Sequence, residues 1–104
     1  MLDTTALVQA VERYADRLRA TPQSRLRQGA ARQGLALARE LTYRAQRLET
    51  PDATLRELPD AGIFTVGDQV AVTGHDLAEA LAATDDEAAL TDAVRLVTTA
   101  AARM

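Results

Sequence analysis

The fold class depends on one short stretch, Ile63-Phe64-Thr65-Val66-Gly67-Asp68-Gln69-Val70-Ala71-Val72. Two runs rich in β-branched residues surround a Gly-Asp pair, and Gly67 suits the first central position of a type II′ turn. The preceding Asp60-Ala61-Gly62 has the composition of a turn. The stretch therefore predicts a β-hairpin over about residues 63–72.

Both faces of this hairpin would be largely apolar. With a two-residue loop, one face carries Ile63, Thr65, Val70 and Val72, and the other carries Phe64, Val66, Gln69 and Ala71. A three-residue loop would instead gather Phe64, Val66, Val70 and Val72 on one face. An isolated two-stranded ribbon is marginal in water, so helices of the same chain or a second copy must cover it. We expect a second copy, and hence a homodimer held by Phe64, Val66 and Ala71.

The segments on either side of the hairpin indicate helices. Thr73 and Thr84 each precede an acidic residue at capping-box spacing, which predicts helices at about residues 75–83 and 86–102. Before the hairpin, Thr50-Pro51 predicts a short helix ending before Pro59. Upstream of it, Thr21-Pro22 predicts a long helix to about Leu48, in which Gly29 lies on the polar side and would allow a bend.

A first helix is expected from Asp3 to about Ala20, with apolar residues on one face. The inward positions expected for the three longest helices are Leu7, Val11, Tyr14 and Leu18; then Leu26, Ala30, Leu37, Leu41, Ala45 and Leu48; and finally Leu90, Ala93, Val94, Val97, Ala101 and Met104. Gly34 falls on the apolar face of the long helix, where a missing side chain lets another helix approach closely. Residues 1–104 thus predict one mainly α domain of the α+β class: a small bundle of four main helices and a short one, with the hairpin inserted.

The residue types that are missing exclude much chemistry. The 104 residues include no Cys, Lys, Trp or Asn, and only one His and one Ser. There can be no disulfide, thiolate nucleophile, Schiff-base lysine or two-histidine metal motif. With only three aromatic residues, a cofactor pocket is not expected, and no cofactor or metal is predicted. The Lys-free, Arg- and Ala-rich composition is typical of a bacterial GC-rich genome.

No signal peptide or membrane span is recognisable in the sequence, so a cytoplasmic location without membrane association is expected. The charge is unevenly distributed along the chain. Residues 1–50 carry nine Arg against five acids (+4), whereas residues 51–104 carry three Arg against ten acids (−7).

One stripe on the long helix contains much of the positive charge. At 100° per residue, its members fall within about 80° of one another and span about 33 Å, close to one turn of duplex DNA; they are Arg25, Arg32, Arg39, Tyr43 and Arg47. A solvated outer face is the simplest interpretation. The alternatives are an acidic protein partner and a nucleic acid, although the pI near 5.0 disfavours the latter.

His75 is the centre of a third hypothesis. It stands beside Asp76 and Glu79, and could serve as a general base in a small enzyme or ligand-binding protein. Capping accounts for most of these acids, so we do not expect an enzyme. The leading prediction is a small non-enzymatic protein–protein interaction module that self-associates. A nucleic-acid-associated regulator using the Arg stripe is the alternative.

Overall fold

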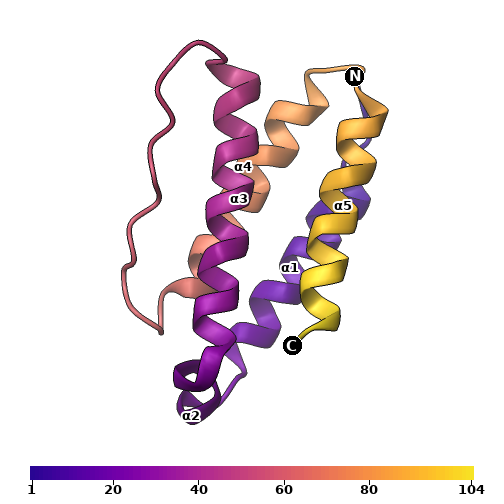
Figure 1. Ribbon diagram of the computed structural model, residues 1–104. Coiled ribbons are helices and arrows are strands. Elements are labelled where there is room, and N and C mark those ends of the chain that lie inside the picture. The colour runs from indigo at the N-terminus through magenta and orange to yellow at the C-terminus, as the bar shows by residue number, and fades with distance from the viewer.

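The computed structural model describes all 104 residues and contains helices only (Figure 1). A π-helical segment, η1, joins the short second helix to the third. The elements are α1 Thr5–Arg19, α2 Gln23–Arg25, η1 Leu26–Ala30, α3 Ala31–Glu49, α4 Val66–Ala82 and α5 Glu87–Ala102. The helical bundle expected from the sequence is confirmed, but the α+β class is wrong.

The predicted β-hairpin at residues 63–72 does not exist. Ile63 to Thr65 form a turn, and the rest of the stretch is the first part of α4. The deciding pattern is the helical spacing of Val66, Val70, Leu77 and Leu81, all of which are buried. Because α4 packs against two other helices, burial of this face outweighs the modest β preference of valine.

The four long helices form a bundle in which α4 occupies the centre. Figure 1 shows α1 descending, α3 and α4 both ascending, and α5 descending again. α4 packs on α3 and on α1, whereas α5 packs chiefly on α1 and only slightly on α3. The core accordingly contains 20 buried hydrophobic residues, most of them from α1, α3 and α4.

Glycines allow the close helix contacts around α4. A Cβ at Gly74 would overlap the methyl groups of Val11 in α1, with Cγ2 at 2.6 Å. A Cβ at Gly34 in α3 would lie 2.6 Å from Val66 Cγ1 and 2.8 Å from Leu18 Cδ1. The expectation that Gly34 admits a neighbouring helix is therefore confirmed.

Gly29 interrupts the long helix that the sequence predicts over residues 22–48. Its φ of 146° and ψ of −18° are not helical, and they produce a kink within η1. Such a positive φ is accessible to glycine at little cost. The kink turns α2 and η1 away from the axis of α3 at the lower end of the molecule (Figure 1).

Residues 50–65 form a linker that runs back along α3, and the short helix expected after Thr50 is absent. Side chains of the neighbouring helices hold this linker. Gln46 binds Arg56 twice, donating to its carbonyl (2.9 Å) and accepting from its N–H (2.8 Å). Arg39 Nε donates to the Leu58 carbonyl at 2.9 Å, and Gln69 donates to the Pro59 carbonyl at 3.0 Å.

The boundaries of α1 and α5 agree closely with the sequence, but those of α4 and the capping expected at Thr73 and Thr84 do not. α1 and α5 lie within two residues of the expected ranges. Asp86 caps α5 by accepting from the Ala89 N–H at 3.0 Å. The helix expected at 75–83 is the second half of α4, where Thr73 donates to the Gln69 carbonyl instead of capping.

Candidate functional site

The residues expected to hold a homodimer do not share one surface. Val66 is only 2% exposed and belongs to the core, whereas Phe64 is 71% exposed at the start of α4. Ala71 is half-buried and packs against the core. The sequence analysis missed Val72, which is 60% exposed on the outer side of α4. Phe64 and Val72 are therefore the apolar side chains that this region offers to a partner.

The Arg stripe is divided by the kink and by the linker. Arg25 lies in α2, before Gly29, and the other members lie in α3. Arg39 is bound to the linker through the Leu58 carbonyl and through Glu57 Oε1 at 3.3 Å. Tyr43 is half-buried, while Arg32 and Arg47 are exposed. The members thus do not form one uninterrupted exposed surface.

His75 has a local partner but no cavity. Its Nε2 lies 3.4 Å from Glu12 Oε1 on α1, and both side chains are about half exposed. It lines none of the five main surface pockets. No group of three or more His, Cys, Asp or Glu residues is arranged to hold a metal ion.

A concave surface lies between α3 and α5 and is called here the α3–α5 groove. It consists of two adjoining pockets of about 340 and 250 Å³ that share Glu40. Because α5 packs chiefly on α1, α3 and α5 stand apart and α4 passes behind them (Figure 1). The apolar lining residues come from all three helices and are Ala36, Leu37, Leu48, Leu77, Leu81, Ala89, Ala93, Leu96 and Ala100.

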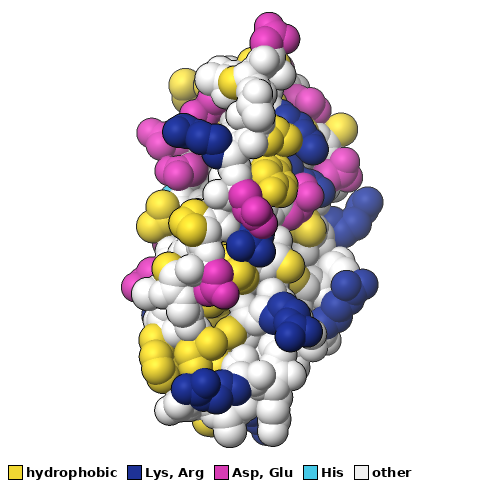
Figure 2. All heavy atoms as spheres, turned by 60° about the vertical axis from the view of Figure 1, so that its left-hand side comes forward, with side chains coloured by type: hydrophobic (Ala, Val, Ile, Leu, Met, Phe, Trp, Pro, Cys, Tyr) yellow, Lys and Arg dark blue, Asp and Glu magenta, His cyan; other side chains and the backbone are white.

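Basic side chains predominate at the rim of the α3–α5 groove. Arg44 and Arg47 border the pocket of about 340 Å³, and Arg103 borders the pocket of about 250 Å³. The two acids of the rim already have partners: Glu40 binds Arg44 at 3.2 Å, and Asp92 lies 3.7 Å from Arg95. In Figure 2 the molecule is seen from the side of the linker. Arg side chains project along the right-hand edge of the molecule in this view, and this edge faces the viewer in Figure 1. The groove therefore has an apolar floor and a net positive rim.

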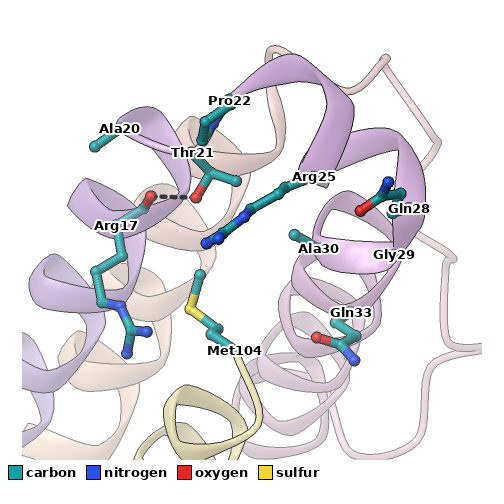
Figure 3. Close-up of a pocket in the computed structure, with 10 residues that line it drawn as sticks. All are labelled: Arg17, Ala20, Thr21, Pro22, Arg25, Gln28, Gly29, Ala30, Gln33 and Met104. Atoms are coloured by element: carbon teal, nitrogen blue, oxygen red, sulfur yellow. Dashed lines mark hydrogen bonds between the residues drawn. The ribbon is translucent and has the colours of Figure 1, made fainter.

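A third pocket, the basal pocket, lies at the lower end of the groove and shares Gln33 with it. Its volume is about 510 Å³. It is an open hollow bordered by the end of α1, the α2–η1 segment, the start of α3 and Met104. Figure 3 shows its lining: Arg17, Ala20, Thr21, Pro22, Arg25, Gln28, Gly29, Ala30, Gln33 and Met104.

Tyr14 is the one core side chain with an unsatisfied polar atom at the α1–α5 contact. It is 1% exposed, and its hydroxyl has no hydrogen-bond partner. Burial raises the pKa of Tyr14 above its ordinary value of 10.0, and the nearby Arg17 opposes part of that effect. The neutral phenol is thus favoured in the folded protein.

Comparison with protein-family models, curated proteins and solved structures finds no match for this chain. No helix combines the length with the apolar character that a membrane-spanning helix requires.

The α3–α5 groove was not expected from the sequence, although one signal for it exists in α5. Apolar residues occupy more than one face of this helix: Val97 faces the core, while Leu96 and Ala100 line the groove. A helix whose apolar residues exceed one stripe has more apolar surface than one neighbour covers.

Proposed function

We propose that this chain is a non-enzymatic protein–protein interaction module whose α3–α5 groove binds an acidic amphipathic helix of a partner protein. The observation that supports this function most directly is the apolar groove with a positive rim. Grooves of this kind accept a helix that inserts large apolar side chains at spacings of three and four residues.

The dimensions of the groove suit such a helix. Its α3 wall extends from Gln33 to Leu48, which corresponds to about 22 Å at 1.5 Å per residue. A partner helix of about four turns would fill that length. Small and accessible side chains such as Ala36, Ala89 and Ala100 leave room for leucine or phenylalanine from the partner.

The charge of the rim selects an acidic partner over a basic one. Arg47 and Arg103 have no carboxylate partner within the chain, and Arg44 shares only Glu40. A second copy using this same groove would bring two positive rims together. Opposite charges at the rim raise the association rate and disfavour wrong partners.

A pair of designed peptides tests this proposal. Both are helical and carry leucine on one face; one has Glu and the other Lys at the flanking positions. Fluorescence anisotropy at low salt should show saturable binding of the Glu peptide, with a Kd on the order of micromolar because a single helix buries a small interface. Binding of the Lys peptide should be at least tenfold weaker, roughly 1.4 kcal/mol.

Two alanine substitutions locate the binding site. Ala36 is exposed and lines the groove, so Ala36→Glu adds both bulk and a repelling charge while keeping a good helix former. Ala6 is exposed in the first turn of α1, outside the groove, and Ala6→Glu is the matched control. Equal binding by the two variants, or equal binding of the two peptides, would disprove the proposal.

Self-association remains a separate prediction. The exposed Phe64 and Val72 are the side chains available to it, and they lie outside the residues that line the α3–α5 groove. A homodimer through this region would leave the groove free for the partner helix.

A further inference from the structure

We propose that the basal pocket is a binding site for a small organic oxyanion, namely a carboxylate or phosphate ester that carries a short apolar body. This inference does not depend on the function proposed for the α3–α5 groove. It rests on the charge, the apolar walls and the construction of the pocket.

The side chains that line the pocket are basic or uncharged, although the chain as a whole is acidic. The ten lining residues include Arg17 and Arg25 but no Asp or Glu, in a protein with a net charge of −3. Neither Arg has a carboxylate within 4.0 Å. The side chain of Arg25 makes no hydrogen bond within the chain, and Figure 3 shows its guanidinium group reaching toward Met104. Its planar set of N–H donors suits the paired oxygens of a carboxylate or phosphate.

Arg17 adds a fixed positive charge on the opposite wall. Its Nη1 donates to the Ala101 carbonyl at 3.1 Å, which holds the side chain between α1 and α5. The other N–H groups of this guanidinium have no partner within the chain. Two arginines on different helices thus border one pocket.

The remaining lining divides into polar and apolar parts. Gln28 and Gln33 lie on the η1 and α3 side of the pocket, Gln28 above Gln33 in Figure 3, and a glutamine amide can donate to a ligand oxygen. Pro22, Ala30 and Met104 supply apolar walls. A cavity of about 510 Å³ falls within the usual range for small-molecule sites and exceeds what a bare inorganic anion needs. The ligand class is therefore an anion with an apolar body.

The kink at Gly29 creates this cavity. Arg25 and Gln28 precede the kink and Gln33 follows it. An uninterrupted helix would extend these side chains along one axis, and no concave surface would form between α2 and α3. The positive φ of Gly29 instead turns the Arg25 segment back over the end of α1 (Figure 3).

The test uses phenyl phosphate and inorganic phosphate as probes, titrated into the full chain at low salt. Isothermal calorimetry should detect one saturable site, and phenyl phosphate should bind more tightly than inorganic phosphate. Arg25→Gln should weaken phenyl phosphate binding by about tenfold or more, the effect of losing a charge-assisted pair of hydrogen bonds. Arg25 is exposed, so circular dichroism should show the fold of this variant unchanged.

Arg27→Gln is the matched control, because Arg27 is exposed on the adjacent η1 segment and does not line the pocket. It should change the affinity less than twofold. Equal losses of affinity in the two variants would show that phenyl phosphate binds by general electrostatic attraction, and the proposed site would be wrong. Absence of saturation at millimolar phenyl phosphate would overturn it as well, and equal affinity for both probes would refute the assigned ligand class.

Discussion

The contact between α1 and α4 makes a sharp prediction for Gly74→Ala. Gly74 lies in the middle of α4, where helix propensity alone favours alanine by about 1 kcal/mol. The new methyl group, however, would overlap both methyls of Val11, with Cγ2 only 2.6 Å away. Two opposing effects therefore act at this one position.

The steric effect should exceed the gain in propensity. Val11 is fully buried, and a β-branched side chain in a helix has one strongly preferred rotamer, so its methyls cannot turn away. Inserting a methyl into such a packed contact costs about 1–3 kcal/mol. The α1–α4 contact holds two of the long helices together, which places the cost at the upper end of that range. We expect a net loss of about 1–2 kcal/mol in the free energy of unfolding.

Denaturant unfolding followed by circular dichroism measures this loss, and a double-mutant cycle identifies its cause. Val11→Ala alone should cost about 2 kcal/mol because it empties part of the core. In the double variant Val11→Ala, Gly74→Ala, the new methyl would occupy space that the valine vacated. The double variant should therefore lose at least about 1 kcal/mol less than the two single losses combined. A Gly74→Ala protein more stable than the parent, with no coupling to Val11, would refute the α1–α4 packing.

Three further predictions concern single side chains. Tyr14→Phe should raise the free energy of unfolding by about 1 kcal/mol by removing an unsatisfied buried hydroxyl. Because burial raises the pKa of Tyr14 in the folded protein, its titration leaves the free energy of unfolding unchanged below pH 10.0 and lowers it as the pH rises through the folded pKa. Denaturation curves at alkaline pH should therefore show a smaller loss of stability in Tyr14→Phe than in the parent protein. Phe64→Asp should leave stability within about 0.5 kcal/mol and abolish self-association in sedimentation velocity; a persisting dimer would exclude this surface. Gln46→Ala should cost about 1 kcal/mol and speed hydrogen exchange at the Arg56 amide, whereas unchanged exchange would show that the linker is held otherwise.

The sequence was most informative where a helix buries one apolar face. Leu7, Val11, Tyr14 and Leu18 were expected on the inner face of α1, and all four are buried. In α3, Leu37, Leu41 and Ala45 agree in the same way. A period of 3.6 residues sustained over several turns determines both the element and its inward face, since no other regular structure produces it.

The error at residues 63–72 arose because the pattern was judged over too short a window. Within ten residues, Val66, Val70 and Val72 fit an alternating strand as well as a helix. Extending the window to Leu77 and Leu81 distinguishes the two, because these leucines continue the helical period and contradict a period of two. Gly67 was interpreted as a turn residue, but it lies inside α4 and admits the side chain of Arg19.

The candidate sites were harder to predict, because each requires elements that are distant in the sequence. Nothing near Arg25 indicates that it lines one pocket with Arg17; the kink at Gly29 determines this. Likewise, Leu48 and Ala89 line one pocket although they belong to different helices. Periodicity shows which face of a helix is buried, but it does not show which helices remain apart.

The linker explains why α3 and α5 remain apart. Short connections throughout would make neighbouring helices antiparallel and would close a four-helix bundle on all sides. Residues 50–65 instead return along the length of α3, so that α4 starts beside the start of α3 and runs parallel to it (Figure 1). The linker covers the flank of α3 that carries Arg39 and Gln46, while α5 is placed over α1. The opposite flank of α3 is then covered only in part by α5, and Ala36 and Leu48 on this flank remain exposed. The groove is thus a consequence of chain connectivity, and shortening the linker to an ordinary turn would force α4 to reverse and remove it.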